Sequence, residues 1–270
     1  MISRQTMKDA APWAIRVAHL WRRAANQIRY PFVASAVELR AGGRIMSGPF
    51  AGLRAPHSGI SWTHYIQMLG LYEKSLVPAI EAVIARQLAV IVDVGSHWGY
   101  YALGLAMRCP RSRVVAYEMD RSRAQLLQKY GRLNGLERRL EVRGICTIEE
   151  LAADLAGLKG AFLLMDVEGA EDTLLDPVRV PGLRHTEIIV ELHDSMVPGV
   201  TERLRAAFAS THQEVLLQYE NASIETVMTG SMIKHRLFRN VINRLMDERR
   251  ASLMCWLYLK PNEQLTSTVS

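Results

Sequence analysis

An acidic residue and two glycines stand close together in the segment Asp93-Val-Gly-Ser-His-Trp-Gly-Tyr100. The segment follows a short apolar run and precedes a helical pattern, so it marks the junction of a strand and a helix. Gly95 allows a sharp turn, and Gly99 lets the helix begin without a side chain that blocks a ligand. Because the first N–H groups of a helix are free to bind a ligand, the segment predicts a cofactor-binding turn. We assign six residues to it: Asp93, Gly95, Ser96, His97, Gly99 and Tyr100.

Two classes of cofactor use a glycine turn at this position. A dinucleotide site requires G-x-G-x-x-G, and here His97 and Tyr100 occupy its second and third glycine positions. A site for S-adenosylmethionine uses Asp-x-Gly-x-Gly-x-Gly or a relaxed form, which the acidic residue and both glycines fit, with His97 at the tolerant middle position. The turn therefore favours S-adenosylmethionine over a nicotinamide dinucleotide. Asp93 could then orient the amino group of that ligand through a bound water.

A second acidic residue, Glu118, ends the next apolar run, 23 residues after Gly95. A carboxylate in this place can accept hydrogen bonds from both ribose hydroxyls of an adenosine cofactor. We assign Glu118 and the adjacent Met119 to the cofactor site. The alternative is a glycine turn that only packs a helix on a strand, with Glu118 exposed.

Three further polar residues follow later apolar runs: Asp166, Glu168 and His193. Parallel strands bring their carboxyl ends to one edge of the sheet, where ligands bind. Methyl transfer to a hydroxyl requires alignment of donor and acceptor and removal of one proton. His193 is the first candidate for the general base, because an imidazole titrates near pH 6.5, and Glu168 is the second. Either residue could instead have a purely structural role, Glu168 as a helix cap and His193 as a hydrogen-bonded strand-end residue.

Metal binding is a weaker alternative. Asp166, Glu168, Glu191 and Asp194 offer the hard oxygen ligands that suit magnesium, but strand-end carboxylates are common without a metal, and we expect none. The three cysteines, Cys109, Cys146 and Cys255, are far apart and show no C-x-x-C spacing, which argues against a zinc site or a disulfide framework.

Short apolar runs alternate with helical patterns from residue 88 onward. The strands are expected at 88–94, 113–118, 140–145, 161–167, 187–192 and 214–219, and the helices between them at 100–108, 121–133, 148–158, 170–175 and 201–209. Continuous apolar strands that alternate with helices indicate a parallel sheet covered on both faces. The pattern therefore predicts a doubly wound α/β fold.

The ends of the chain differ from this core. Helical periodicity is expected over 8–30 and 61–86, with a Gly/Ser/Pro-rich loop over 41–61 and a kink at Pro78. A basic helical insertion over 229–250 precedes a last strand over 254–260, which we expect antiparallel at the sheet edge. We divide the chain into a basic extension (1–60), a catalytic domain (61–262) and a flexible tail (263–270). The N-terminal helices could mediate homo-oligomer formation.

Charge separates the extension from the domain. Residues 1–60 carry a net charge of +7, and residues 61–270 carry −1. A neutral domain lacks the clustered cations that a nucleic-acid groove requires. No apolar stretch reaches the roughly 18 residues of a membrane span, and the N-terminus is a poor signal peptide. We expect a cytoplasmic protein with a small-molecule or glycan partner.

The motif Leu163-Leu-Met-Asp-Val-Glu-Gly-Ala-Glu171, with the segments 70–73, 190–194 and 256–258, resembles the "DxEGxE" pattern and flanking motifs of the FkbM-like branch of class I S-adenosylmethionine-dependent methyltransferases. The resemblance covers roughly residues 68–260. It implies a seven-stranded Rossmann-like sheet and, commonly, O-methylation of a hydroxyl on a sugar, glycan or natural product. It also implies that Cys146 borders the adenine and that Asp166 belongs to the cofactor site. Two departures stand out, the bulky His97-Trp98 pair in the glycine turn and Cys146-Thr147 where an acidic residue is often found.

Three alternatives to this function remain at this point. The chain could methylate a nitrogen or a carboxylate of a small molecule or peptide. It could be a cofactor-binding module that has lost catalysis. The third, a nicotinamide-dependent oxidoreductase, is disfavoured by the failed G-x-G-x-x-G pattern. The sequence after Asp166 also lacks the Asn/Asp-Pro-Pro-aromatic turn that holds a nucleobase amino group, so a nucleic-acid acceptor is not expected.

Overall fold

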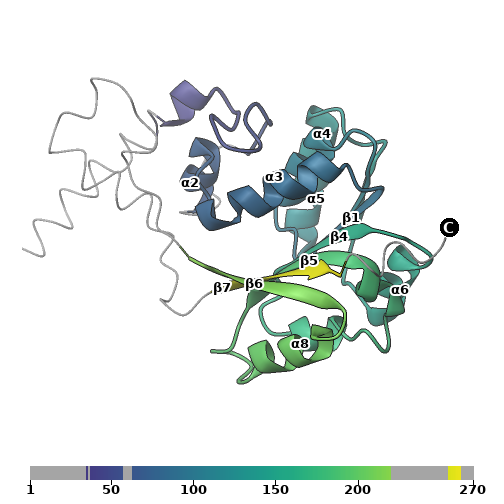
Figure 1. The fold of residues 1–270 in the computed structure, drawn as a ribbon. Helices are drawn as coiled ribbons and strands as arrows, with labels where there is room; N and C mark the ends of the chain where they lie inside the picture. The colour runs from purple at the N-terminus through teal and green to yellow at the C-terminus, as the bar shows by residue number, and fades with distance from the viewer. Residues whose placement is uncertain (1–34, 36, 57–62, 220–254, 263–270) are drawn as a thin grey trace, which may run out of the picture.

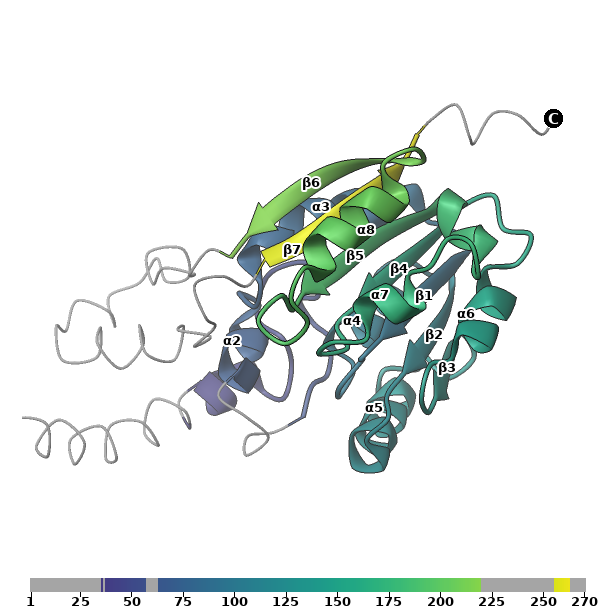
Figure 2. The ribbon, with the colours of Figure 1, turned by 90° about the horizontal axis from the view of Figure 1, so that it is seen from below.

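A computed structural model describes residues 35, 37–56, 63–219 and 255–262 of the chain. These residues form one seven-stranded sheet with helices on both faces (Figures 1 and 2). The strand order is β3-β2-β1-β4-β5-β7-β6. The strands are β1 (Val90–Val94), β2 (Arg113–Tyr117), β3 (Leu140–Arg143), β4 (Ala161–Met165), β5 (Thr186–Leu192), β6 (His212–Gln218) and β7 (Cys255–Pro261).

The sheet is mostly parallel, as the alternation of strands and helices predicts. Strands β1 to β5 pair in parallel, and β7 pairs antiparallel with both β5 and β6. The antiparallel direction of the last strand is confirmed, but its expected place at the edge is wrong, since β7 lies between β5 and β6. Burial explains the order: residues 256–259 of β7 are buried, whereas β6 exposes most of its residues and suits the edge.

Two layers of helices cover the sheet, and each encloses its own apolar core. One layer contains α2 (Thr63–Leu69), the 3-10 turn η1 (Lys74–Leu76), α3 (Val77–Arg86), α4 (Tyr100–Arg108) and α5 (Arg121–Leu133). The other contains α6 (Ile148–Leu155), α7 (Glu171–Leu174), the 3-10 turn η2 (Pro181–His185) and α8 (Val200–Phe208). In Figure 2, α6, α7 and α8 lie in front of the sheet, and α3 lies behind it. A doubly wound sheet of this kind places its ligands beyond the carboxyl ends of the strands.

Local sequence accounts for where several helices begin. The Asp120 side chain caps α5 by accepting the N–H groups of Ser122 and Arg123, and Thr147 forms a capping box with Glu150 at α6. Pro78 lies in the first turn of α3, so it starts that helix and does not kink a longer one.

The expected helix over 61–86 is interrupted at residues 70–73. Gly70 and Glu73 both adopt left-handed backbone angles, with φ of 76° and 46°, which end α2 and reorient the chain before α3. The preceding segment 41–56 is largely turns, as predicted, yet Ile45, Phe50 and Leu53 are buried in the core of the α2–α5 layer.

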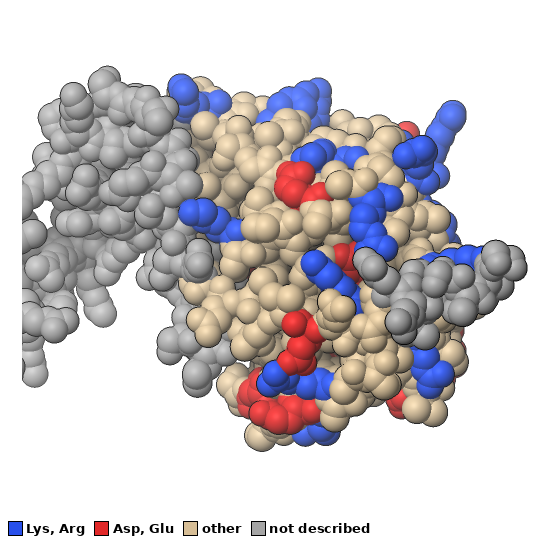
Figure 3. Space-filling view, in the orientation of Figure 1, with Lys and Arg blue, Asp and Glu red and all other residues tan. Residues whose placement is uncertain are grey.

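The predicted helices 8–30 and 229–250 and the tail 263–270 lie outside the described residues. The domain boundary near residue 60 remains a prediction. None of the described helices is long and apolar enough to cross a membrane. On the face seen in Figure 3, lysines and arginines are separated by uncharged surface along the top and are interspersed with carboxylates below.

Candidate functional site

The order of the strands reverses between β1 and β4, because β1 leads to β2 on one side and β4 leads to β5 on the other. Such a switch point opens a crevice at the carboxyl ends of the strands. Gly95 lies directly in it, with φ of 88°, and a Cβ at this position would stand 1.8 Å from the backbone carbonyl oxygen of Asp166. Only glycine allows the turn after β1 to approach the end of β4 this closely.

Backbone hydrogen bonds hold the turn against β2. The N–H groups of Gly95 and Ser96 both donate to the carbonyl oxygen of Tyr117 at 3.0 Å. His97 adopts the left-handed conformation with φ of 51°, a conformation that a glycine would favour. Gly99 follows with φ of 99° and begins α4 without a side-chain cap. The first departure from the family pattern is therefore accommodated by an uncommon backbone conformation at His97.

Glu118 is tied to this turn. Its carboxylate is only 5% exposed, and Oε2 accepts the backbone N–H of His97 at 2.7 Å while Oε1 accepts that of Asp120 at 2.7 Å. The structure thus places Glu118 against the glycine turn, and it is buried, unlike the exposed carboxylate of the alternative. Each oxygen retains a second lone pair that can accept from a ligand.

Asp93 is a buried carboxylate without a well-formed hydrogen bond to the described residues. Its side chain is 1% exposed, and neither oxygen has a hydrogen-bond partner of ordinary geometry among the described residues. Burial raises the pKa of Asp93 from 3.8 to about 7, the nearby Ser96 hydroxyl and Ala102 N–H lower it, and the charges of Asp166 and Glu118 raise it further. A cationic group beside Asp93 would offset the cost of this buried charge.

A pocket extends from Asp93 toward the loop before α3. Five of the residues assigned from sequence line it: Asp93, Ser96, His97, Tyr100 and Asp166. Seven others do so that sequence reasoning did not assign: Gln67, Tyr72, Glu73, Trp98, Tyr101, Leu164 and Trp256. Tyr72 and Glu73 lie in the segment 70–73, and Trp256 lies in the segment 256–258. Both segments support the resemblance found in the sequence, which was the available signal for these three residues. No lysine or arginine is among these lining residues.

Two aromatic side chains of the pocket, Trp98 and Tyr101, are held in place by hydrogen bonds of their own polar groups. Trp98 Nε1 donates to Gln67 Oε1 at 2.8 Å, and the Tyr101 hydroxyl donates to the buried carboxylate of Glu73. Burial raises the pKa of Tyr101 well above its ordinary value, so the phenol keeps its proton. Aromatic rings next to carboxylates make a surface suited to a cation.

His193 follows β5 and lies beside the same pocket. Its Nδ1 contacts Glu171 Oε1, and its Nε2 lies 3.8 Å from Oδ1 of the pocket residue Asp166. The hydrogen bond to Glu171 raises the pKa of His193 against the opposing effect of burial, and the charges of Asp166 and Glu168 raise it further. Burial raises the pKa of Glu171, but its hydrogen bonds to His193 and the backbone outweigh this and leave that pKa below its ordinary value.

Asp166, Glu191 and His193 also form a set of neighbouring ligand atoms. One atom from each lies within 4.8 Å of the others. The geometry is compatible with a divalent cation, although Glu168 and Asp194, which the sequence also offered, are not part of the set.

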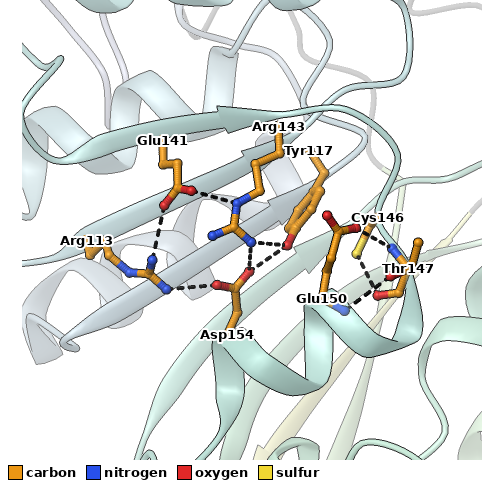
Figure 4. A network of polar contacts seen from close by, with 8 residues as sticks. All are labelled: Arg113, Tyr117, Glu141, Arg143, Cys146, Thr147, Glu150 and Asp154. Atoms are coloured by element: carbon orange, nitrogen blue, oxygen red, sulfur yellow. Dashed lines mark hydrogen bonds and ion pairs between the residues drawn. The ribbon is translucent and has the colours of Figure 1, made fainter.

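Seven assigned residues do not line the pocket. Gly95 and Gly99 form the turn beside it, Glu118 contacts that turn and His193 lies near Asp166. The other three are Met119, Glu168 and Cys146. Met119 is exposed. Glu168 has a left-handed backbone with φ of 50°, and Gly169 follows it beside Val197. Non-glycine residues in this conformation cluster at functional sites. Cys146 lies beyond β3, at the start of α6 (Figure 4).

A polar network fixes the region around Cys146. Asp154 of α6 is buried and accepts hydrogen bonds from Arg113, Arg143 and the Tyr117 hydroxyl, which joins α6 to β2 and β3 (Figure 4). Burial and the carboxylates of Glu150 and Asp154 raise the pKa of the Cys146 thiol to about 12. This thiol is therefore a neutral group and a poor nucleophile at neutral pH.

Another hollow lies away from the strand ends, between α8 and the start of β6. It is lined by Arg205, Ala206, Phe208, Ala209, His212, Glu214 and Leu259. None of these residues was assigned from sequence, and the hollow lies outside the crevice of the switch point. We therefore take the pocket beside Asp93 as the candidate site.

No protein-family model and no curated protein sequence matches this chain. Several solved structures have a similar fold. The O-methyltransferase TomG from Streptomyces achromogenes, in complex with SAM, is 14% identical with a TM-score of 0.43, over 76% of this chain and 83% of its own. An O-methyltransferase from Bacillus cereus, in complex with SAH, is 14% identical with a TM-score of 0.41, over 76% and 84%. The tRNA methyltransferase TrmK from B. subtilis is 12% identical with a TM-score of 0.41, over 67% and 63%.

Proposed function

We propose that this chain is an S-adenosylmethionine-dependent methyltransferase of the FkbM-like branch that methylates a hydroxyl of a sugar, glycan or other natural product. One observation carries the proposal. At the switch point of the sheet, the buried carboxylate of Asp93 has no hydrogen-bond partner of ordinary geometry among the described residues. It lies in a pocket with aromatic walls, and none of the described residues that line this pocket is a lysine or an arginine. A sulfonium with an ammonium group is a cationic ligand of the kind this pocket requires.

The residues around the turn supply the contacts that such a cofactor needs. Asp93 would pair with the ammonium group of the cofactor. The turn from Gly95 to Gly99 brings the backbone and the uncapped start of α4 close to the ligand. Glu118 would accept hydrogen bonds from the ribose hydroxyls with the lone pairs that His97 and Asp120 leave free. We keep Ser96, Tyr100, Met119, Cys146 and Asp166 as further cofactor contacts.

When bound, the sulfonium supplies a methyl group for in-line displacement. The protein must then align the acceptor oxygen and remove its proton. His193 is the proposed general base, because its Nε2 lies 3.8 Å from Oδ1 of Asp166, a residue that lines the pocket. Glu168 is the second candidate. The base would take the proton of the acceptor hydroxyl as the oxygen takes the methyl group, and the electron pair of the broken sulfur–carbon bond would stay on sulfur.

Calorimetry with S-adenosylhomocysteine and with S-adenosylmethionine tests the cofactor. We expect saturable binding of both and no binding of NADH under the same conditions. Radiolabelled S-adenosylmethionine with a panel of hydroxylated acceptors then tests the reaction. Failure to bind either sulfur ligand contradicts the proposal, and transfer only to amines or carboxylates contradicts the O-methylation part of it.

A further inference from the structure

Glu171 lies on the side of His193 that faces away from Asp166, and it contacts Nδ1. An ionised carboxylate only accepts hydrogen bonds. Oε1 of Glu171 already accepts the backbone N–H of Gly169 at 3.0 Å, so it is an acceptor oxygen, and its contact with His193 requires a proton on Nδ1. When the ring is neutral, the lone pair is therefore on Nε2, the nitrogen nearer Asp166 and the pocket.

Glu171 is anchored through Oε1, one of its two carboxylate oxygens. The residue is fully buried, and its Oε1 also accepts the backbone N–H of Gly169 at 3.0 Å. The short helix α7 that carries it is joined to α8, because Arg203 donates to Asp172 at 2.7 Å. Leu174, one turn later, is buried in the core of the α6–α8 layer.

We propose that Glu171 is a positioning residue that keeps the proton of His193 on Nδ1 and presents Nε2 to the acceptor hydroxyl. The inference rests on the proposed function, since it names the partner of the proposed base. The proton that leaves the hydroxyl moves to Nε2, and the resulting imidazolium lies between two carboxylates. Nucleophile activation by an oriented histidine follows the same logic as in hydrolytic triads, with the acceptor hydroxyl in place of a protein nucleophile.

The carboxylates around the ring favour its protonated form, and its burial opposes that form. Glu171 faces it from α7, Asp166 and Glu168 from the end of β4, and Glu191 from β5. A base in this environment binds a proton more strongly than a free imidazole. Removing the charge of Glu171 should therefore weaken the base even where the shape of the site is unchanged.

Nuclear magnetic resonance of metal-free protein with ¹⁵N-labelled histidine tests the proposal without knowledge of the acceptor. The His193 signals are identified by their loss in His193→Asn. We expect the Nδ1–H tautomer above the pKa of His193, and a pKa above the ordinary value of 6.5. In Glu171→Gln, whose amide oxygen still accepts from Nδ1, the pKa should fall by about 1–2 units.

Asp172→Asn is the matched control, because it removes a carboxylate one residue away that pairs with Arg203. It should leave the pKa of His193 within about 0.3 units of the wild type. An Nε2–H tautomer in the wild type, or a pKa that does not change in Glu171→Gln, overturns the proposal. Selective broadening of the His193 signals by one equivalent of Mn²⁺ also overturns it, because a ligating Nε2 cannot accept the proton.

Calorimetry with S-adenosylhomocysteine on the same samples separates this inference from the function. We expect wild type and Glu171→Gln to bind it within about threefold of each other, since Glu171 does not line the cofactor pocket. Binding without the expected resonance result contradicts the role of Glu171 alone. The expected resonance result without binding contradicts the methyltransferase assignment and leaves the orientation of the ring established.

Discussion

Oε2 of Glu118 accepts the backbone N–H of His97 at 2.7 Å, which links the carboxylate after β2 to the glycine turn after β1. The other oxygen accepts the N–H of Asp120 at 2.7 Å. Both donors are backbone groups of turns that must keep their shape to receive a ligand. The carboxylate therefore holds the turn in place. It also keeps lone pairs that can accept hydrogen bonds from a ligand.

Glu118→Gln should weaken binding of S-adenosylhomocysteine about tenfold or more. A carboxylate can accept at both oxygens, whereas an amide must turn its NH₂ group toward either His97 or Asp120 and leave two donors facing each other. A lost charge-assisted hydrogen bond costs about 1.5–3 kcal/mol. Calorimetry measures the change, with the exposed Glu137→Gln as the control. Unchanged affinity in Glu118→Gln would remove this residue from the site.

Much of the fold could be predicted because the strands are buried on both faces and therefore appear as continuous apolar runs. Strands β1 and β4, for example, are buried along their full length, and Gly95 marks where the first of them turns. The position of β7 between β5 and β6 could not be predicted in this way. It depends on which long-range pairing buries Trp256 and its neighbours, and local periodicity carries no information about that choice.

Sequence reasoning could select candidate site residues that follow strands directly, such as Asp93 and Glu118. It could not select partners that come from another element. The contact of Glu171 with His193 spans 22 residues, and the bond from Trp98 to Gln67 spans 31. Both depend on how α7 and α2 pack, which only the three-dimensional structure shows.

Gly95→Ala should prevent stable folding or destabilise the protein by more than about 3 kcal/mol. The new Cβ would lie 1.8 Å from the carbonyl oxygen of Asp166, so backbone has to move. Gly135→Ala is the matched control, since Gly135 also has a positive φ of 68° but no atom within 4 Å of the position that a methyl group would take. It should cost only about 1 kcal/mol of backbone strain. Thermal unfolding of both variants measures the difference, and equal costs would show that the contact with Asp166 is unimportant.

His193→Asn should reduce methyl transfer to a hydroxyl acceptor by about 10²–10⁴-fold, the usual contribution of a positioned general base. Affinity for S-adenosylhomocysteine should stay nearly unchanged, because His193 does not line the pocket beside Asp93. Radiolabel transfer and calorimetry on one preparation give the two values. An active His193→Asn variant would shift the role of base to Glu168, which Glu168→Gln would then test.

Asp93→Asn should stabilise the ligand-free protein in a manner that depends on pH. The pKa of Asp93 is about 7 in the folded protein against an ordinary value of 3.8. The folded state therefore holds a proton that the unfolded state releases, and stability falls as pH rises from about 4 to about 7. Replacement by asparagine removes this cost, so the gain should be absent at pH 4 and reach on the order of 2–4 kcal/mol at pH 8.

The same variant should lose affinity for S-adenosylmethionine by about tenfold or more, since the cation loses its buried carboxylate. In the wild type, a bound cation favours the ionised form of Asp93, so affinity should rise with pH and level off above about 7. Thermal melts and calorimetry between pH 5 and 9 test both effects, with Asp172→Asn as the control for loss of a carboxylate elsewhere. The prediction fails if Asp93→Asn is no more stable than the wild type at pH 8 and binds the cofactor normally. That result would show that the buried charge of Asp93 does not destabilise the fold and that the ligand does not use it. A stabilised variant with weakened binding would identify Asp93 as a carboxylate whose burial destabilises the fold and serves cofactor binding.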